Sequence, residues 1–325
     1  MALLFDYYGL LGTARDVARG EDGTTIGDLL ELVTESVIGA LSELDTLPVA
    51  EIAAEMNRLD QTVPLAVRDA LPEIVPAIED AAERFLAGGR LIYIGAGTSG
   101  RVGVLDASEA VPTFGIDASQ VQGIIAGGPS AVTLPTEGAE DDAEAGATAI
   151  RDAAVGPLDT VIGLASSGRT PYVLRAMEEA GTLGALRIGI SCNSPAALSK
   201  VVDHAIEVVV GPEIIGGSTR LKAGTAQKLV VNMISTIVMV KAGKTYGNLM
   251  VDVRASNDKL RRRAVAIVRE VSGADEAQAL AALEATDFEA KPAILMIRAQ
   301  LDAATARARL DAHGGRLREA LKEVQ

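Results

Sequence analysis

A glycine-rich segment, GAGTSGR at residues 95–101, follows a short apolar run and could bind a phosphate group. Its glycines match the spacing G-x-G-x-x-G, which lets the backbone approach a pyrophosphate when the turn joins a strand to a helix. Dinucleotide binding also requires an acidic residue at the end of the next strand, to hold the ribose hydroxyls. The next apolar segment ends IIAGGPSAVTLP, with no acid between Asp117 and Glu137. We therefore expect this turn to bind a ligand other than NAD.

A second polar segment, ASSGRTPYV at residues 165–173, has the composition of a phosphate-binding turn. It offers hydroxyl donors, a glycine that lets the backbone approach, and a fixed cation: Ser166, Ser167, Gly168 and Arg169. Thr170 is predicted to cap a helix that has Pro171 at its first position, so free N–H groups would point toward the turn. An ordinary capped helix start would explain the same residues. The matching turn at 95–101 favours a ligand that spans two strand ends, where open α/β sheets bind ligands.

A third segment, GGSTRLKAGTAQK at residues 216–228, predicts another helix start. Ser218 and Thr219 lie at the expected start and Lys222 in the first turn. Serines at helix starts most often cap the helix. Lys222 could provide an additional contact to a phosphate or carboxylate.

The elements that must position these turns alternate between short apolar runs and helical patterns. Continuous apolar strands separated by helices indicate a parallel sheet covered on both faces. We expect a doubly wound α/β fold with strands at 90–95, 121–127, 160–166, 185–191 and 205–211.

Helical patterns flank the predicted sheet on both sides. Residues 27–89 read as helices, and the chain beyond 256 is helical to its end. The basic cluster Arg261–Arg263 is typical of a solvated helix face. These patterns predict an N-terminal helical segment, an α/β domain and a small all-helical domain, with the boundaries 1–54, 55–250 and 256–325.

Composition limits the class of partner and the compartment. The formal net charge of −14 argues against nucleic acid or an anionic membrane as partner. One cysteine, Cys192, excludes an internal disulfide, and only two histidines are present, so we expect no zinc site. The N-terminus lacks a basic signal-peptide region, and the apolar stretch at 230–240 is too short to span a bilayer and reads as a buried helix. We expect a cytoplasmic protein.

Several long motifs resemble the N-acetylmuramic acid 6-phosphate etherase family, in order and with similar spacing from about residue 34 onward. They are GRLIYIGAGTSGRVGVLDASEAVPTFG, EGAEDDAEAG, ASSGRTPYV, GISCN, GSTRLKAGTAQKLVVNM and YGNLMVDV. The resemblance implies an α/β domain of the sugar-isomerase (SIS) type, a small C-terminal helical domain and a homodimer. It also implies cleavage of the lactyl ether of N-acetylmuramic acid 6-phosphate, which yields N-acetylglucosamine 6-phosphate and D-lactate. It implies no metal or redox cofactor.

The resemblance also assigns site residues. The two catalytic glutamates of the family correspond to Glu109 in DASEAVP and Glu140 in EGAEDD. The phosphate turns correspond to Thr98 and Ser99, flanked by Gly97 and Gly100, and to 166–170.

Three features depart from the family pattern. Residues 1–33 have no counterpart in it. The family opening TE-x-RN reads TESVI here, so Val37 and Ile38 replace an arginine and an asparagine, which puts any polar contact made there in doubt. The segment SCNSPAALSK is shorter than the family's CNPGSPL type of loop, and SEAVPTFG replaces the more usual SECPPTFG, which leaves the proposed catalytic residues untouched.

The reaction requires two carboxyl groups in opposite protonation states. Ring opening exposes an aldehyde at C1 and makes the C2 proton removable; one group takes that proton and the other protonates the departing C3 oxygen. Glu140 is expected in the first turns of a helix that begins near Thr136, where the dipole lowers the pKa of a carboxyl and suits a base. Glu109 is expected near the end of a helix, just before Pro112, which suits a proton donor.

Other interpretations of these glutamates stay open. Both could simply face solvent, as most helical glutamates do. Glu109 lies nine residues beyond Gly100, about 13 Å along a helix, so either the sugar lies along the helix or Glu109 serves the site of a partner subunit.

Two other functions also fit this pattern. An SIS-type aldose–ketose isomerase would use the same turns with one glutamate base and would release no lactate. A sugar-phosphate sensing module that regulates a partner protein would have no use for two carboxyl groups.

Overall fold

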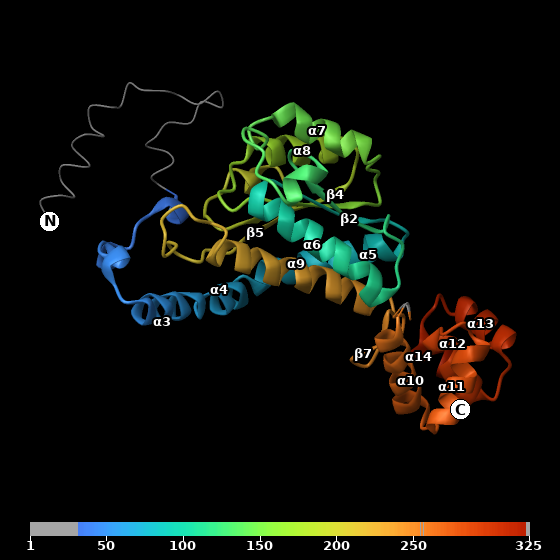
Figure 1. Ribbon diagram of the computed structural model, residues 1–325. Coiled ribbons are helices and arrows are strands. Elements are labelled where there is room, and N and C mark those ends of the chain that lie inside the picture. Colours follow the sequence, from blue (N-terminus) through green and yellow to red (C-terminus); the bar gives the residue numbers. More distant parts are fainter. Residues whose placement is uncertain (1–31, 254, 256, 323–325) are drawn as a thin grey trace, which may run out of the picture.

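The structure is a computed structural model that describes residues 32–253, 255 and 257–322 (Figure 1). Expectations for residues 1–31 lie outside the described residues. The described N-terminal part begins with three 3₁₀ turns, η1 Val33–Glu35, η2 Gly39–Leu41 and η3 Leu44–Thr46. Helices α3 Val49–Asp60, α4 Val63–Asp69 and α5 Leu71–Leu86 follow, as predicted. The prediction of helix is wrong for residues 32–47, where the chain forms only these short turns.

Five parallel strands form the central sheet in the order β2-β1-β3-β4-β5. They are β1 Leu91–Gly95, β2 Val121–Ile125, β3 Thr160–Leu164, β4 Leu186–Ser191 and β5 His204–Glu207. The doubly wound five-stranded sheet expected from the sequence is therefore confirmed. The direction of winding reverses between β1 and β3, and these two strands end in register, with Gly95 opposite Leu164. The turns that follow them consequently emerge side by side.

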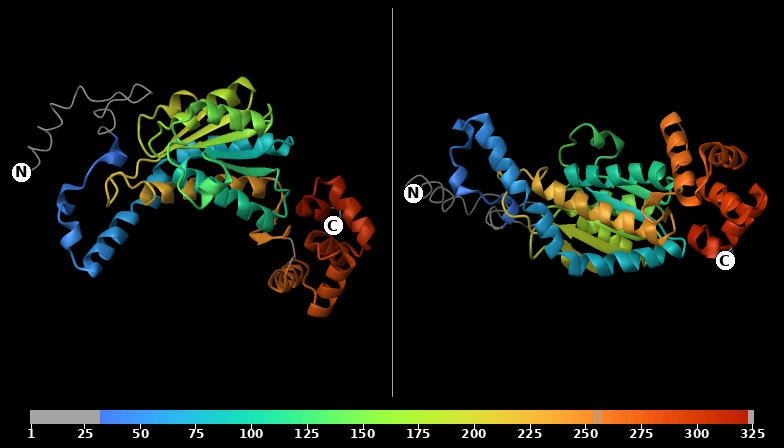
Figure 2. Two further views of the ribbon diagram at one scale, coloured as in Figure 1. Left: turned by 45° about the horizontal axis from the view of Figure 1, so that its top comes forward. Right: turned by 90° about the horizontal axis from the view of Figure 1, so that it is seen from below.

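Helices cover both faces of the sheet (Figures 1 and 2). Leu91 and Tyr93 point to the face covered by α5, α6 Gly97–Phe114 and α9 Lys222–Lys241. Ile92 and Ile94 point to the opposite face, covered by α7 Ala143–Asp152 and α8 Pro171–Thr182. Every residue of β1 is buried. This burial on both faces explains why its sequence is continuously apolar, as is typical of a strand at the centre of a parallel sheet.

Helix α9 contains the apolar stretch at 230–240 and is longer than that stretch suggests. Its 20 residues are long and apolar enough to cross a membrane by composition alone. More than half of its most apolar part is buried, and Val230, Val231 and Ile234 belong to the core beneath the sheet. The prediction of a buried helix is confirmed.

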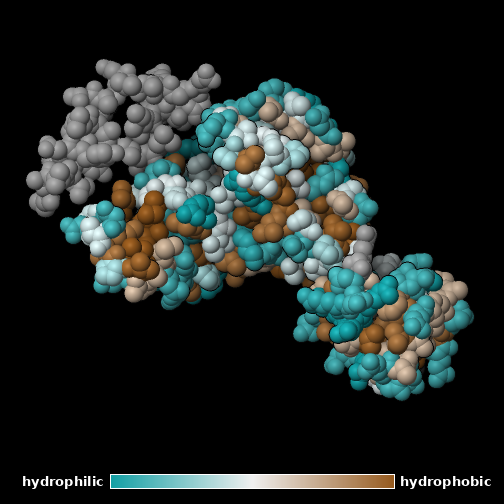
Figure 3. All heavy atoms as spheres, in the orientation of Figure 1, coloured by the Kyte–Doolittle hydropathy of each residue, from teal (hydrophilic) through white to brown (hydrophobic). Residues whose placement is uncertain are grey.

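The arm formed by η1–η3 and α3 carries apolar side chains with little cover. None of the residues of α3 is buried, although Ile52, Met56 and Leu59 share one face and are half-buried. Val37 is 81 % exposed and Val49 is 83 % exposed. Figure 3 shows apolar side chains gathered on the part of the molecule that holds α3 and α4.

The C-terminal region has its own apolar core. After the short antiparallel pair β6 Thr245–Tyr246 and β7 Leu249–Met250, the helices are α10 Asp258–Ser272, α11 Glu276–Ala285, α12 Ala290–Ala299, α13 Ala303–Ala312 and α14 Leu317–Lys322. Its buried residues run from Val251 to Leu321. Arg261–Arg263 are exposed, as expected for a solvated face, and the Arg261 guanidinium lies 4.9 Å from the centre of the Phe288 ring.

Candidate active site

The two polar turns meet at the point where the sheet reverses its winding. Ser99, at the start of α6, and Ser166, in the turn after β3, are both nearly buried. Their hydroxyl oxygens lie 3.4 Å apart. In open α/β sheets the crevice at this position binds ligands. The expectation that these two turns lie side by side is confirmed.

Glycines give the first turn its close geometry. A Cβ on Gly100 would lie 2.6 Å from the Gly95 carbonyl oxygen, and one on Gly95 would lie 2.8 Å from the Gly100 nitrogen. Gly97 has a φ of +52°, in the left-handed region. Ala96 occupies the N-cap position of α6 and provides no side-chain cap. The positive end of α6 and its first-turn N–H groups are therefore directed at the crevice.

The second turn is held from behind by the segment after β4. The Ser166 carbonyl accepts hydrogen bonds from the Cys192 backbone N–H at 3.0 Å and from Asn193 Nδ2 at 2.9 Å. The Ser167 hydroxyl accepts one from the Arg169 backbone N–H at 3.2 Å. Gly168 has a φ of +69° and packs so closely that an added Cβ would lie 2.5 Å from Ala196 Cβ.

Thr170 occupies the N-cap position of α8, and Pro171 is its first residue, as predicted. The Thr170 side chain, however, makes no capping hydrogen bond to the first turn of the helix. Thr170 therefore lies at the predicted N-cap position but does not make the predicted capping hydrogen bond.

The TESVI segment attaches to the second turn. Thr34 is fully buried, and its hydroxyl accepts a hydrogen bond from Asn193 Nδ2 at 3.0 Å. Its backbone N–H donates to Asn193 Oδ1 at 3.3 Å. Asn193 thus joins the N-terminal arm to the carbonyl of Ser166. Val37 points away from this contact, as its 81 % exposure shows.

The position predicted for Glu140 within a helix is wrong. Helix α7 begins at Ala143, and Asp142 caps it by accepting a hydrogen bond from the Ala145 N–H at 2.9 Å. Gly138 has a φ of +70°, which a helix does not allow. Glu140 therefore lies in the preceding turn, where the Tyr172 backbone N–H donates to its carbonyl at 3.0 Å.

The environment of the Glu140 carboxyl also reverses the expected direction of its pKa. Partial burial raises the pKa above its ordinary value, and the negative charges of Asp141 and Glu137 raise it further. The Tyr172 contact places the Glu140 backbone against the first turn of α8, two residues beyond Thr170.

Glu109 lies on an exposed face of α6. The helix continues through Pro112 to Phe114 and ends at Gly115, which has a φ of +62°. Glu109 therefore lies near the C-terminal end of the helix, as predicted, although the last turn, where the negative end of the dipole acts, begins beyond it. Within one chain, about 13 Å of helix separates Glu109 from Gly100.

Lys222 is engaged inside the protein. It is 3 % exposed, and its Nζ donates to the Val210 carbonyl at 2.6 Å. Burial lowers the pKa of its ammonium group, against the opposing effect of Glu213. A contact with a ligand, as considered from the sequence, would require the ammonium group to leave Val210.

The start of α9 also differs from the prediction. The helix begins at Lys222 with Leu221 at its N-cap position, so Ser218 and Thr219 lie in the preceding turn. The buried Glu213 carboxylate accepts hydrogen bonds from the backbone N–H groups of Lys222 at 3.0 Å and Ala223 at 2.9 Å. This helix start is therefore already occupied by a carboxylate.

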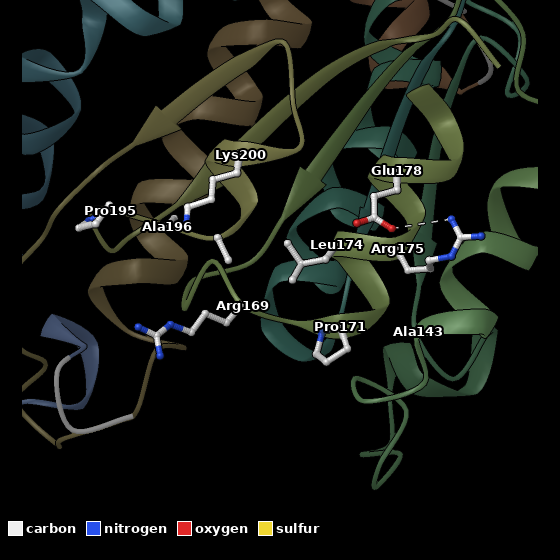
Figure 4. A pocket seen from close by; sticks show the side chains of 10 residues that line it. Ala143, Arg169, Pro171, Leu174, Arg175, Glu178, Pro195, Ala196 and Lys200 are labelled. Atoms are coloured by element: carbon white, nitrogen blue, oxygen red, sulfur yellow. Dashed lines mark ion pairs between the residues drawn. The ribbon is translucent and has the colours of Figure 1, made fainter. Parts of the chain in front are cut away.

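A cavity of about 590 Å³ adjoins the second turn (Figure 4). Its volume suits a small-molecule ligand. Its walls come from the Arg169 turn, from α8 and from the segment after β4: Ala143, Arg169, Pro171, Leu174, Arg175, Glu178, Pro195, Ala196, Ala197 and Lys200. None of these residues belongs to the first turn, so the cavity lies beside the pair of turns. Arg169 belongs to the second turn and also lines this cavity.

The described residues bring neither a metal site nor a reactive thiol to this crevice. Within the described part of the chain, no three His, Cys, Asp or Glu side chains lie close enough together to hold a metal ion. Burial, and to a lesser degree Glu213, raises the pKa of the Cys192 thiol to about 12, so the sulfur stays protonated and unreactive.

Sequence reasoning missed Gln227, which contacts the first turn. Its Oε1 accepts a hydrogen bond from the Ser99 hydroxyl at 2.8 Å, and the side chain is fully buried. A signal was present, because Gln227 interrupts the apolar face that α9 presents with Ala223 and Val230. A polar residue at such a position needs a hydrogen-bonding partner.

Comparison with known proteins places this site in a family. The chain matches the SIS domain family over residues 143–237. It also matches the N-terminal SIS domain of glucokinase regulatory protein over 73–181 and the C-terminal lid domain of that protein over 247–292. These matches define an SIS-type protein and agree with the five-stranded sheet.

Curated relatives identify the family within this class. N-acetylmuramic acid 6-phosphate etherase of Streptomyces avermitilis is 54 % identical over 90 % of this chain and 94 % of its own length. The etherase of Rubrobacter xylanophilus is 54 % identical over 90 % of this chain and 97 % of its own. That of Enterobacter sp. is 52 % identical over 91 % and 99 %. The chain belongs to the N-acetylmuramic acid 6-phosphate etherase family of enzymes.

Proposed function

We propose that the protein cleaves the D-lactyl ether of N-acetylmuramic acid 6-phosphate by elimination and addition of water. The products are N-acetylglucosamine 6-phosphate and D-lactate. The observation that carries this proposal is the meeting of Ser99 and Ser166 at the switch point of the sheet, with their hydroxyl oxygens 3.4 Å apart, in a chain of the etherase family.

The phosphate is held by the two turns. The N–H groups at the start of α6 and the hydroxyls of Ser99, Ser166 and Ser167 donate hydrogen bonds to its oxygens, and Thr98 and Thr170 flank them. Arg169 contributes a guanidinium group, which suits phosphate geometry. Local donors are needed because the protein as a whole carries a formal charge of −14.

The elimination requires one base and one acid. The Glu140 carboxylate removes the C2 proton of the open-chain aldehyde, and Glu109 gives its proton to the C3 oxygen as the C–O bond breaks and a C2–C3 double bond forms. Water then adds at C3: Glu109 takes the proton of the water, and Glu140 returns its proton to C2. Each carboxyl group thereby returns to its initial protonation state. General acid–base catalysis of this kind contributes about 10²–10⁴-fold to the rate for each group.

The sequence suggested Glu140 as the base because a helix dipole would lower its pKa. The structure supports the same role for another reason, because its pKa is raised. Burial and its acidic neighbours make the carboxylate a stronger base than an ordinary glutamate. A base whose pKa lies closer to the working pH is more effective at removing a proton from carbon.

We also propose that the site is shared between the subunits of a homodimer. Glu109 is exposed and, within one chain, about 13 Å of helix away from the first turn. A partner subunit could bring its own Glu109 to the crevice. The uncovered apolar residues of the arm and of α6, including Val49 and Leu105, support burial against a second copy.

We further propose the domain division 1–54, 55–250 and 256–325 and a cytoplasmic location. The separate core from Val251 to Leu321 supports a C-terminal unit.

The activity is tested by incubating purified protein with N-acetylmuramic acid 6-phosphate and measuring D-lactate and N-acetylglucosamine 6-phosphate. Equal amounts of both products are expected. Conversion to a ketose phosphate without lactate would instead support the isomerase, and binding without turnover would support the sensing module.

The roles of the two glutamates are tested in deuterated water. The Glu109→Gln variant should exchange the C2 proton with solvent but release no lactate, whereas Glu140→Gln should do neither. Exchange in Glu140→Gln and its absence in Glu109→Gln would reverse the roles.

Sharing of the site is tested by mixing two inactive variants, Glu109→Ala and the double variant Ser99→Ala/Ser166→Ala. In a shared site, mixed dimers contain one intact site, so lactate release should return to about a quarter of the wild-type rate at equal mixing. No recovery after subunit exchange would refute sharing.

A further inference from the structure

The amide of Gln227 is buried directly behind the phosphate turn and is only half satisfied. Its Oε1 accepts from the Ser99 hydroxyl at 2.8 Å, and the side chain is fully buried. Its Nε2 has no hydrogen-bond partner among the described residues. Burial of an amide N–H without a partner costs free energy, and native structures rarely keep such a group without a reason.

Reversing the amide does not remove the problem in this arrangement. With oxygen and nitrogen exchanged, Nε2 would donate to the Ser99 oxygen and Oε1 would be left without a partner. Each orientation therefore satisfies one end of the amide, and the two differ in what Ser99 does with its single proton. In the observed orientation the Ser99 proton is committed to Gln227. In the reversed orientation Ser99 accepts from Gln227 and keeps its proton to donate.

A phosphate group requires the reversed orientation. Phosphate oxygens accept hydrogen bonds, so every hydroxyl that contacts them must donate. The Ser99 hydroxyl has one proton and cannot give it to Gln227 Oε1 and to a phosphate together. The neighbouring Ser166 hydroxyl, 3.4 Å away, faces the same demand.

We propose that Gln227 is a positioning residue for the sugar phosphate and acts through Ser99. This inference rests on the proposed function, because it takes the phosphate to lie at the two turns. When the phosphate binds, the amide turns Nε2 toward the Ser99 oxygen, and the Ser99 proton turns toward the phosphate. The hydroxyl is then fixed from behind and donates a charge-assisted hydrogen bond in front.

The test compares Gln227→Met with the wild type in D-lactate release. Methionine has a similar length and fits an apolar surrounding but can neither donate nor accept in this way. The KM for N-acetylmuramic acid 6-phosphate should rise about tenfold, with kcat changed less than threefold. The inhibition constant of inorganic phosphate should rise in parallel. An unchanged KM, or a fall in kcat alone with unchanged phosphate inhibition, would overturn the proposal.

A double variant separates action through Ser99 from a general effect on the fold. Because Gln227 acts only through the Ser99 hydroxyl, Ser99→Ala/Gln227→Met should bind phosphate no more weakly than Ser99→Ala alone. Losses that multiply would contradict this. If Gln227→Met does not fold, Gln227→Glu provides the second variant: it keeps the shape and the acceptor but, when ionised, lacks the donor, so the phosphate inhibition constant should again rise.

Thr160→Val is the matched control. The Thr160 hydroxyl is the other buried side-chain polar atom without a partner in the described part of the chain, and it lies at the opposite end of β3 from the turns. Its removal should leave KM and phosphate inhibition unchanged; an equal rise in KM would show that the effect of Gln227→Met is not local.

The experiment also separates this inference from the proposed function. Thermal stabilisation of the wild type by inorganic phosphate, compared with that of Gln227→Met, needs no turnover. If the wild type releases no lactate but loses phosphate stabilisation on Gln227→Met substitution, the reaction is refuted and the positioning role stands. Equal stabilisation of both proteins by phosphate refutes the positioning role.

Discussion

Substitution of Gly168 by alanine should distort the second turn, and the structure gives two separate reasons. The φ of +69° is unfavourable for any residue with a Cβ and costs about 1–2 kcal/mol. The added Cβ would also lie 2.5 Å from Ala196 Cβ and 3.2 Å from Ser191 Cβ, and such overpacking costs about 1–3 kcal/mol. Gly168→Ala should therefore lower the free energy of unfolding by about 2–5 kcal/mol.

Two further variants divide this loss into its parts. Gly273, which follows α10, has a φ of +76° in the left-handed region and open space around an added Cβ, so Gly273→Ala should lose only about 1–2 kcal/mol. In the double variant Gly168→Ala/Ala196→Gly the atom that collides with the new Cβ is absent. Relative to Ala196→Gly alone, the Gly168→Ala substitution should then cost about as much as Gly273→Ala.

Urea unfolding at pH 7 measures these differences as changes in midpoint at constant slope. The same proteins should differ in phosphate binding, because the shifted backbone carries Ser167 and Arg169 with it. Equal losses for Gly168→Ala and Gly273→Ala, or no recovery in the double variant, would refute the packing argument.

Two further predictions concern charge. With Glu140 as the base, kcat/KM should fall at low pH as its carboxylate is protonated. The double variant Glu137→Gln/Asp141→Asn should move this fall to lower pH, because two charges that raise the pKa of Glu140 are removed. A pH–rate profile that does not move would contradict the assignment. The Arg90 guanidinium and backbone N–H groups outweigh the effect of burial and hold the pKa of Asp159 below its usual value. The stability from this ion pair is therefore present above about pH 4 and is lost as pH falls through the depressed pKa. Because Asp159 is 5 % exposed, Asp159→Asn should lower the free energy of unfolding in urea by about 2–3 kcal/mol at pH 7. The loss should be smaller at pH 3, where the wild-type carboxylate begins to be protonated. An equal loss at both pH values would show that the charge is unimportant.

The sheet could be predicted from the sequence because its strands are buried on both faces. Such strands appear as uninterrupted apolar runs, and β1 is the extreme case. The two turns could be predicted for a related reason. Glycine and hydroxyl residues directly after a parallel strand lie at the edge of the sheet where ligands bind, whatever the details of packing.

Helix boundaries near the glutamates could not be predicted as well, since competing local interactions decide them. The acidic run around Glu140 resembles a helix start, but Asp142 is the residue whose side chain caps α7, and Gly138 adopts a backbone conformation outside the helix. Pro112 usually ends a helix. Here α6 tolerates it close to its end and stops three residues later at Gly115, where a left-handed φ is available without strain.

The partners of Lys222 and Gln227 depend on tertiary contacts that no local pattern contains. Lys222 donates to the carbonyl of Val210, twelve residues away, and Gln227 contacts Ser99, 128 residues away. Residue type alone suggested a ligand contact for Lys222 and gave Gln227 no role. In the folded protein the Lys222 ammonium group is hydrogen-bonded inside the protein, whereas Gln227 contacts the first turn.

The most direct test of the account is D-lactate release from N-acetylmuramic acid 6-phosphate by the wild type beside the Ser99→Ala/Ser166→Ala variant. The central claim is that the two turns hold the phosphate while the glutamates act on the ring carbons. It predicts lactate from the wild type, with a KM at least tenfold higher or no detectable turnover in the double variant, although that variant remains folded. Lactate release with an unchanged KM after loss of both hydroxyls would contradict the account.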